Sequence, residues 1–251
     1  MNSIFYHAII ITYYYIIILS KQEINNVKRV KVSNNVIRRL PRYLRKLDEL
    51  QIAGINRISS FELGQQLGLT PSQIRQDFSC FGEFGQQGYG YNVAVLRTQI
   101  ASILGMDRGY KAILVGVGNI GHAMMDNFSF RDCGIDLVAA FDVKQSLIGT
   151  EFEGVPIYDE ADMEDFLKTH EIAIAVLSVP KEVAVQVTKT LTDCGIDAIW
   201  NFTNVELTEP NSTTIVENIH FSDSLLSLSY FVSERMDEKA ARAARAERAE
   251  K

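Results

Sequence analysis

Three glycines and an aspartate near the middle of the chain have the types and spacing of a nucleotide-binding motif. The motif directly follows the apolar run 112–115 and consists of Gly116, Val117, Gly118, Asn119, Ile120 and Gly121. Such glycines permit a tight turn, the close approach of a pyrophosphate and close packing of the next helix, whose N-terminus attracts phosphate. Asp142 follows Gly121 by 21 residues, where a carboxylate binds ribose hydroxyls and disfavours a 2′-phosphate. The pattern predicts NAD(H) binding.

Polar residues also follow two later apolar runs, 172–179 and 198–202, which are predicted to be strands. In open parallel sheets the ligand lies beyond the carboxyl ends of the strands. We therefore expect the nicotinamide end of the site to be lined by Ser178, Val179, Pro180, Asn201 and Thr203.

No set of residues in the sequence resembles a catalytic or metal centre. A dehydrogenase needs a proton donor near the nicotinamide. Of the four histidines, only His220 could approach it, and no acidic partner for His220 is evident from the sequence. Cys80, Cys133 and Cys194 lack metal-ligand spacing and indicate a reducing compartment. We expect neither an enzyme nor a metal site.

The second half of the chain alternates strand and helix patterns, which is typical of a doubly wound α/β domain with a parallel sheet. Strands are predicted at 112–115, 137–141, 155–158, 172–179 and 198–202, with helices at 160–169 and 182–191. The segment 221–232 then has one apolar helical stripe, which either packs on its own domain or swaps onto a partner subunit. The charged tail 234–251 is expected to be frayed, because it has little apolar surface to bury.

The first half contains three predicted helices. From Ser33, an apolar stripe recurs at helical spacing, with Ile37, Leu40, Tyr43, Leu44, Leu47 and Leu50, while arginines on the other faces form either a solvated or a phosphate-facing surface. Ser59 and Glu62 form a capping box, and Gly68 ends that helix. Thr70 and Pro71 start another helix. This order predicts a helix-turn-helix whose last helix exposes Ser72, Gln73, Arg75 and Gln76 and buries Ile74 and Phe78.

Glycines and aromatic residues alternate in the segment 81–91 that follows. The composition predicts a tight β-hairpin, which after a helix-turn-helix is either a DNA-contacting wing or a packing element. A helix at 93–104 and a linker at 107–109 lead to the second domain.

Charge is unevenly distributed along the chain. Residues 21–110 carry 13 basic and 7 acidic side chains, whereas residues 111–251 carry 12 basic and 24 acidic ones. A basic first part fits a nucleic-acid-binding module. The apolar run 4–19 is short for a bilayer span and lacks signal-peptide features, so we interpret it as an extension of unknown role and treat a membrane anchor as the minor alternative.

Residues 34–233 resemble the Rex family of redox-sensing transcriptional repressors. The resemblance is carried by RLPRYLRKL, ISSFELGQQLGL, QIRQDFSCFGEFGQQGYGYNV, VGVGNIGHA, AAFDV, SVP, NFTNV and LLSLSYF. It implies a cytoplasmic homodimer, with a winged helix-turn-helix domain, a Rossmann NAD(H)-binding domain and a last helix that swaps into the partner. NAD+ would permit, and NADH prevent, binding to palindromic double-stranded operator DNA.

The resemblance also assigns segments and residues. It divides the chain into an extension at 1–32, a winged helix domain at 33–107, a Rossmann domain at 108–221, a swapped helix at 222–235 and a tail at 236–251. It places Phe221 against the partner's nicotinamide. The implied DNA-binding residues are Ser59, Ser60, Thr70, Ser72, Gln73, Arg75, Gln76, Gly85, Gln86, Gln87, Gly88 and Tyr89.

The sequence departs from the family pattern at two places. Gln76, Gln86 and Gln87 replace basic residues of the recognition helix and wing, which weakens phosphate contacts. In the implied switch, Asn127 and His220 stand where the family has Tyr and Asp, and Arg45 supplies the arginine that joins them in one state. Because protonated His220 would repel Arg45, we expect a response to NADH that changes between pH 6 and 8.

Two other classes of function stay open from the sequence. One is an NAD-dependent oxidoreductase with a helical appendage, which would turn over a substrate. The other is a dinucleotide-binding scaffold that has lost DNA binding, for which the three glutamines are the reason.

Overall fold

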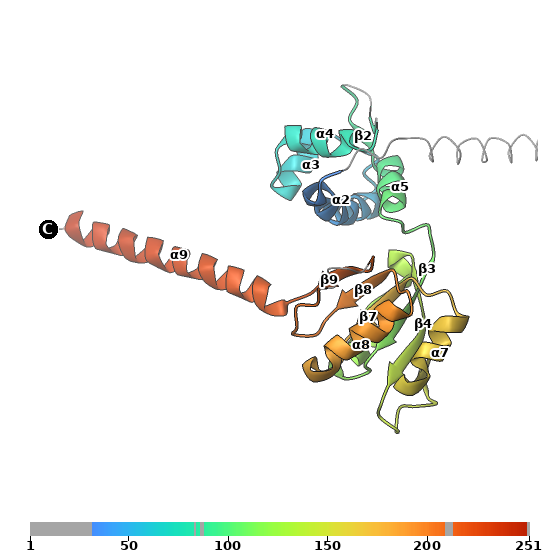
Figure 1. The fold of residues 1–251 in the computed structure, drawn as a ribbon. Coiled ribbons are helices and arrows are strands. Elements are labelled where there is room, and N and C mark those ends of the chain that lie inside the picture. The colour runs from blue at the N-terminus through green and yellow to red at the C-terminus, as the bar shows by residue number, and fades with distance from the viewer. Residues whose placement is uncertain (1–31, 83, 86–87, 209–212, 250–251) are drawn as a thin grey trace, which may run out of the picture. The chain divides into compact units, whose positions relative to one another are not determined.

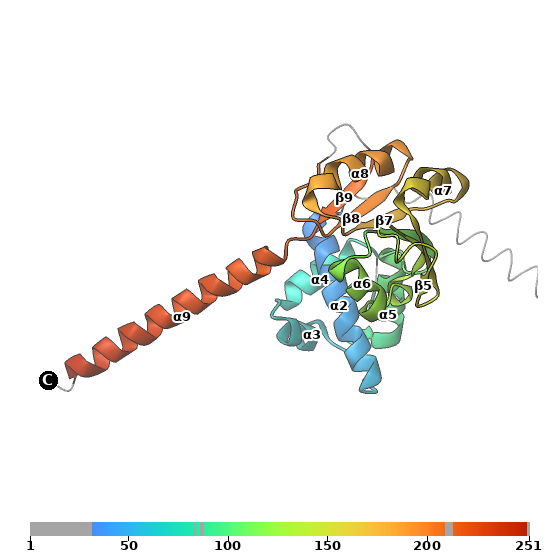
Figure 2. The ribbon, with the colours of Figure 1, turned by 90° about the horizontal axis from the view of Figure 1, so that it is seen from below.

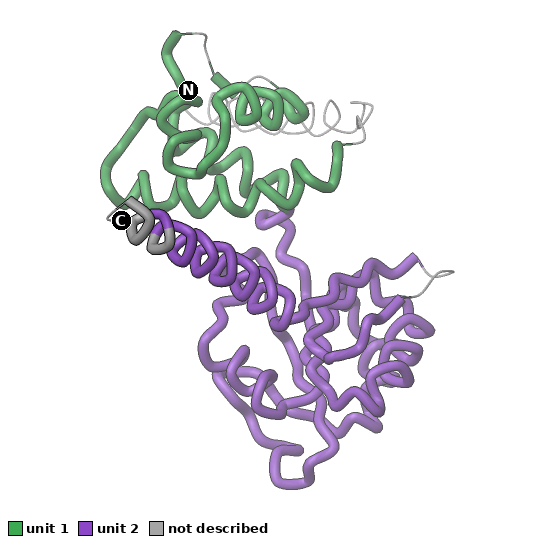
Figure 3. Tube along the Cα trace, turned by 90° about the vertical axis from the view of Figure 1, so that its left-hand side faces the viewer, with its two compact units in different colours: residues 1–104 green, residues 105–251 purple. Residues whose placement is uncertain are grey.

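The structure is a computed structural model that describes residues 32–82, 84–85, 88–208 and 213–249. The chain divides into two compact units, residues 1–104 and 105–251 (Figure 3). The predicted extension up to residue 31, and Gln86 and Gln87, lie outside the described residues.

The described part of the first unit is mainly helical (Figure 1). Its helices are α2 (Asn34–Ile52), α3 (Ser60–Leu67), α4 (Pro71–Ser79) and α5 (Val93–Ile103), and its strands are β1 (Arg57–Ile58) and β2 (Tyr91–Asn92). The predicted helix starts are confirmed. The Ser59 hydroxyl accepts from the Glu62 backbone N–H, the Glu62 carboxylate accepts from the Ser59 N–H, and the Thr70 hydroxyl accepts from the Gln73 N–H.

The buried face of α2 follows the predicted stripe with one shift. Leu40, Tyr43 and Leu47 are fully buried and contact Leu63, Ile74, Phe78, Leu96 and Ile100 in one core. The prediction for Ile37 was wrong: its side chain is 39% exposed, and Val36 is buried instead. The stripe therefore begins one residue earlier, about 100° around the helix.

The predicted hairpin at 81–91 includes residues 83, 86 and 87, which lie outside the described residues, so it stays a prediction. The described part of this segment shows a pairing that was not predicted, because β2 pairs antiparallel with β1, which precedes α3. This pairing requires a glycine at position 90, because φ there is +69° and a Cβ atom would lie 2.7 Å from the Ile58 carbonyl oxygen. A contact between segments this far apart in sequence leaves no local pattern.

The second unit is built on a seven-stranded sheet in the order β5-β6-β4-β3-β7-β8-β9. Only the edge strand β5 (Glu151–Phe152) is antiparallel, to β6. The parallel strands are β3 (Tyr110–Val115), β4 (Ile135–Asp142), β6 (Val155–Asp159), β7 (Ile174–Leu177), β8 (Ala198–Asn201) and β9 (Ile215–Asn218). The strand order reverses between β3 and β7, which is where doubly wound folds bind ligands.

Helices cover both faces of this sheet, as a doubly wound fold requires (Figure 2). Side chains of α7 (Met163–Thr169) and α8 (Lys181–Asp193) join one buried cluster, which includes Phe141 and Leu177. Side chains of α6 (Asn119–Asn127) join the cluster on the other face, which includes Leu114 and Ala140. The short 3-10 turns are η1 (Arg131–Cys133) and η2 (Glu160–Asp162).

Two predictions for the end of the chain need correction. Residues 198–202 are not the last strand, because β9 pairs parallel with β8. Its four residues are two apolar residues followed by two polar ones, which give only a weak strand pattern. The tail is not frayed within the described residues, since α9 continues as one helix from Phe221 to Ala249. Its alanine, glutamate and arginine content favours helix without burial. Residues 221–242 of α9 are all exposed.

Candidate functional site

The glycine motif connects the end of β3 to the start of α6. Gly116 has φ +91°, and a Cβ atom there would lie 2.8 Å from the Ser178 carbonyl oxygen. A Cβ atom on Gly121 would lie 2.1 Å from the Gly116 carbonyl oxygen. Gly118, by contrast, is the N-cap of α6, with no atom within 4 Å of a Cβ position. Two glycines are therefore required by packing, and the third leaves open space at the helix N-terminus.

Asp142 lies at the end of β4 and holds this loop. Its Oδ2 accepts from the Val117 N–H at 2.6 Å, and its Oδ1 accepts from the Lys144 N–H at 2.8 Å. A carboxylate has about four acceptor positions, so capacity for two further donors, such as ribose hydroxyls, is retained. The spacing of Asp142 predicted a ribose acceptor but not its contact with the loop.

Two further acids lie beside Asp142, and the sequence reasoning missed them. Asp159 at the end of β6 is the register partner of Asp142. Burial, and then the charges of Asp142 and Asp159, raise the pKa of Glu160 above its ordinary value. The negative potential at this end of the sheet disfavours a 2′-phosphate, in agreement with the preference for NAD(H) expected from Asp142 alone.

The segment after β7 is tied to the glycine loop. The Ser178 backbone N–H donates to the Val115 carbonyl at 2.9 Å, and its hydroxyl donates to the Gly116 carbonyl at 2.7 Å. Val179 is half-buried, and Pro180 is exposed as the N-cap of α8. Ser178 therefore fixes the turn at Gly116, and this segment lies beside the loop as the prediction requires.

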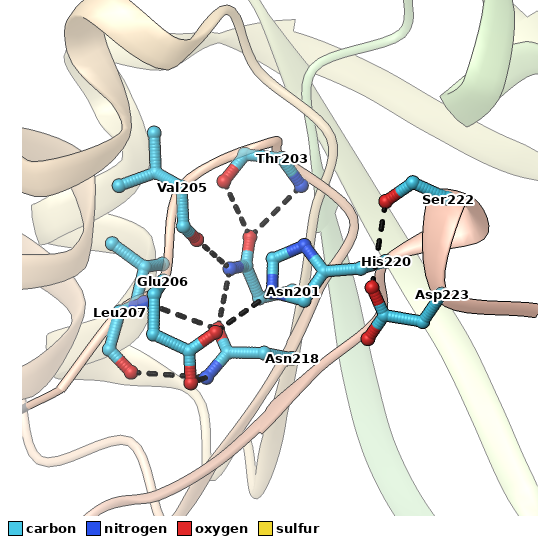
Figure 4. A network of polar contacts seen from close by, with 9 residues as sticks. All are labelled: Asn201, Thr203, Val205, Glu206, Leu207, Asn218, His220, Ser222 and Asp223. Carbon is cyan, nitrogen blue, oxygen red and sulfur yellow. Dashed lines mark hydrogen bonds and ion pairs between the residues drawn. The ribbon is translucent and has the colours of Figure 1, made fainter. Parts of the chain in front are cut away.

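Asn201 and Thr203 are buried, and their polar groups are used inside the protein (Figure 4). The Asn201 amide donates to the Val205 carbonyl at 2.8 Å and to Asn218 Oδ1 at 2.7 Å. Its Oδ1 accepts from the Thr203 N–H at 2.9 Å and from the Thr203 hydroxyl at 2.7 Å. With all its hydrogen-bonding positions occupied, Asn201 shapes the loop after β8, and its contact with a nicotinamide stays a prediction.

The same network reaches the base of α9. His220 Nε2 lies 2.7 Å from Glu206 Oε2, and the Asn218 amide donates to Glu206 Oε1 at 3.2 Å (Figure 4). His220 thus has an acidic partner that the sequence did not reveal, because the pairing of β8 with β9 brings the two segments together. Phe221, the next residue, is 62% exposed.

The other two residues of the implied switch have separate surroundings. The Asn127 amide donates to the Ala123 carbonyl at 3.2 Å and to Asp126 Oδ2 at 3.1 Å. Arg45 is exposed on α2, in the first unit. Within the second unit, Asn127 and His220 have different hydrogen-bonding partners, and the implied role of Arg45 stays a prediction.

A cavity of about 550 Å³ lies elsewhere in the second unit. It is lined at the amino ends of three strands by Tyr110, Lys111, Ile172, Ala173, Ile196 and Asp197, among others. None of the predicted site residues lines it. The described residues contain no group of three or more His, Cys, Asp or Glu that could hold a metal ion. No helix among them is long and apolar enough to span a bilayer.

The exposed face of α4 carries the predicted DNA-reading residues. Ser72, Arg75 and Gln76 are exposed, Gln73 is half-buried, and Ile74 and Phe78 are buried. The Arg75 guanidinium donates to the Ser60 hydroxyl at 3.0 Å. Ser59 and Thr70 use their hydroxyls as helix caps, so they position the starts of α3 and α4.

Arg57, which was not predicted from the sequence, lies beside the glycine-rich segment. Tyr89 is 70% exposed, and the Arg57 guanidinium lies 6.0 Å from its ring centre and donates to its carbonyl at 3.2 Å. Arg57 of β1 is therefore a cation beside the predicted wing. Gly85 and Gly88 are described, with Gly88 at φ +87°. The contribution of Gln86 and Gln87 stays a prediction.

Comparisons with known proteins agree with this division. A family model described as "CoA binding domain" matches residues 107–205, and one described as "Putative DNA-binding protein N-terminus" matches residues 31–79. A redox-sensing transcriptional repressor Rex from Clostridium beijerinckii is 49% identical over 82% of this chain and 98% of its own length. The Rex protein of Caldicellulosiruptor saccharolyticus is 46% identical over 84% and 96%.

Solved structures give the same result. The chain is similar to a crystal structure of RSP in complex with beta-NAD+ and operator DNA, with TM-score 0.77 and 43% identity over 86% of this chain and 99% of that one. RSP in complex with beta-NADH gives TM-score 0.77 and 41% identity over 84% and 99%.

A helix-turn-helix unit followed by a Rossmann unit with a dinucleotide-type glycine loop defines a nucleotide-responsive transcription regulator. Relatives at this identity share both units in the same order over nearly their whole length. The chain belongs to the Rex family of redox-sensing transcriptional repressors.

Proposed function

We propose that this protein is a cytoplasmic repressor that binds operator DNA as a homodimer and is released when NADH replaces NAD+. It would thereby respond to the cellular NADH/NAD+ ratio. The observation that carries the proposal is that one chain holds both a glycine loop held by Asp142 and a capped helix-turn-helix with an exposed polar face. The relatives' names and the ligands of the RSP structures support it.

The nucleotide site has the parts that NAD(H) requires. The first-turn N–H groups of α6, beside the open position at Gly118, would donate to the pyrophosphate oxygens, since such groups have no partner within their own helix. Asp142 would accept the ribose hydroxyls. The segments at Ser178–Pro180 and Asn201–Thr203 would shape the nicotinamide end.

The helix α9 supports the proposed dimer. Its stripe of Phe221, Leu225, Leu228 and Val232 is at least 50% exposed at every position. A soluble monomer rarely exposes a continuous apolar face of this kind. Swapping α9 onto a second copy would bury the stripe and carry Phe221 of one protomer toward the nicotinamide of the other.

A switch of this type works by differential affinity. NADH must favour a dimer whose two recognition helices no longer fit successive major grooves. A tenfold change in operator affinity requires about 1.4 kcal/mol of coupling between the two sites.

The test is a titration of the full-length protein against a labelled fragment of its own upstream region, with NAD+ and then with NADH, at two salt concentrations. Salt-sensitive binding that NADH abolishes is expected. Turnover of a hydroxy substrate would favour an oxidoreductase. Absence of DNA binding in both redox states, with NADH still bound, would favour a dinucleotide-binding scaffold.

A further inference from the structure

The recognition helix α4 is attached to α2 by a buried charged group. Asp77 is 2% exposed and is the one charged side chain that is buried among the residues that the structure describes. The Arg39 guanidinium donates from Nε to Oδ2 and from Nη2 to Oδ1, both at 2.7 Å. The Tyr43 hydroxyl donates to Oδ2 at 2.6 Å. We call Arg39, Tyr43 and Asp77 the α2–α4 clamp.

The clamp combines the ion pair of Arg39 with Asp77 and a hydrogen bond from the neutral Tyr43 hydroxyl. Both carboxylate oxygens accept at least one hydrogen bond, and no buried side-chain polar atom in the described part of the chain lacks a partner. Burial, and then the hydrogen bond to Asp77, raise the pKa of Tyr43 well above its ordinary value, so its hydroxyl remains a donor.

Stability alone does not explain such a group. Replacing a buried ion pair with well-packed apolar residues is often neutral or stabilising, whereas removing one partner is strongly destabilising. Apolar contacts are non-directional, and a bidentate arginine–carboxylate pair is directional. A buried pair of this kind is therefore better suited to fixing one orientation than to adding stability.

The position of Asp77 in α4 shows which orientation is fixed. Asp77 directly follows Gln76, and Arg75 and Gln76 are the exposed residues of the same turn. One residue corresponds to about 100° of rotation around the helix. Phe78 of the same helix makes ring contacts with Tyr43 at 5.0 Å, Tyr91 at 5.1 Å and Phe84 at 5.7 Å between ring centres. Such contacts tolerate rotations that the clamp does not.

We propose that the α2–α4 clamp sets the rotation of the recognition helix and thereby the choice of DNA sequence, with little effect on affinity for DNA of unrelated sequence. Arg39, Tyr43 and Asp77 act as positioning residues for Arg75 and Gln76. The inference rests on the proposed function, because it requires that α4 reads base edges in operator DNA.

The experiment compares affinities for operator and scrambled DNA in three variants of the full-length protein. Arg39→Lys keeps the charge but loses the bidentate fork, and Tyr43→Phe removes one hydrogen bond. The triple variant Arg39→Met/Tyr43→Phe/Asp77→Leu replaces the clamp with apolar side chains. The matched control is Asp48→Asn, which breaks the ion pair of Arg97 with Asp48, a 2.8 Å contact between α2 and α5 at the surface of the same unit.

We expect the operator-to-scrambled affinity ratio to fall at least tenfold in the triple variant and severalfold in Arg39→Lys and Tyr43→Phe. Affinity for scrambled DNA, its salt dependence and NADH affinity should be unchanged in the single variants, and Asp48→Asn should retain the wild-type ratio. An unchanged ratio in both Arg39→Lys and Tyr43→Phe overturns the inference, whether or not the triple variant folds. If wild-type protein itself shows no preference for operator DNA, the proposed function fails instead.

Discussion

The backbone N–H of Val117 donates to the carboxylate of Asp142 at 2.6 Å, across the ends of two neighbouring parallel strands. The group expected to bind the ribose therefore also holds the loop expected to bind the pyrophosphate. Loss of this carboxylate should affect both halves of the nucleotide site at once.

Asp142→Asn tests this relationship. We expect NADH affinity to fall by about 10- to 100-fold, because hydrogen bonds to a charged group contribute about 1.5–3 kcal/mol. Quenching of Trp200, the one tryptophan of the chain, gives the measurement. Operator binding without nucleotide should be retained, and the preference for NADH over NADPH should decrease. Wild-type NADH affinity in this variant would show that Asp142 does not contact the ribose.

Gly118 and Gly121 form a matched pair for the glycine loop. Gly121→Ala should lower the melting temperature and abolish NADH binding, since its Cβ atom would lie 2.1 Å from the Gly116 carbonyl oxygen. Gly118→Ala has open space and should leave the melting temperature within about 2 °C. Its methyl group would nevertheless occupy the approach of the pyrophosphate, so NADH affinity should fall about tenfold or more. Equal NADH affinity in Gly118→Ala and wild type would place the pyrophosphate elsewhere.

Charge on the apolar stripe of α9 should disrupt the proposed dimer. Leu225 and Val232 are 63% and 50% exposed in the single chain, so Leu225→Glu/Val232→Glu should not unfold the second unit. Light scattering should give the dimer mass for wild type and the monomer mass for the double variant. Ser227→Glu, on another face of α9, is the control and should stay dimeric. A dimer that survives in Leu225→Glu/Val232→Glu would exclude α9 from the interface.

The contact of His220 with Glu206 gives a new basis for the expected pH response. Its charged neighbours in the described structure are Glu206, from the loop after β8, and Asp223, whose N–H donates to the His220 carbonyl at 3.2 Å. Histidine side chains as a class change charge between pH 5 and 8, and a protonated ring would strengthen the Glu206 contact at the base of α9. We expect the NADH concentration for half-release from DNA to differ severalfold between pH 6 and 8.

His220→Asn and Glu206→Gln should each remove that difference while retaining NADH binding. An NADH response that is the same at pH 6 and 8 in wild type would contradict the hypothesis.

Glu62 makes the stability of the helix-turn-helix dependent on pH. Hydrogen bonds from the Ser59 backbone and hydroxyl lower the pKa of Glu62. Since the folded-state pKa lies below the unfolded value of about 4.3, the cap contributes fully at neutral pH and is lost as pH falls through the folded value. Glu62→Gln should melt at a lower temperature than wild type at pH 7, and this difference should close as pH falls through the folded-state pKa of Glu62. If the difference in melting temperature between wild type and Glu62→Gln were the same at every pH, the charge of Glu62 would not be its cause.

Features encoded by neighbouring residues were predictable from the sequence. The capping box at Ser59, the Thr70-Pro71 helix start and the glycine spacing at 116–121 depend on contacts within a few residues, so their residue types are sufficient to identify them. The order of the two units and the class of ligand follow from these signals.

Contacts between distant segments were decided only by the tertiary structure. Asp77 with Arg39, Asp142 with Val117, and Glu206 with His220 are separated by 38, 25 and 14 residues. The pairing of β1 with β2 and of β8 with β9 belongs to the same class. In each case the local pattern of one segment does not identify its partner, which is selected by packing of the whole unit. The sequence determined which chemical groups this protein carries, and the fold determined which of them act together.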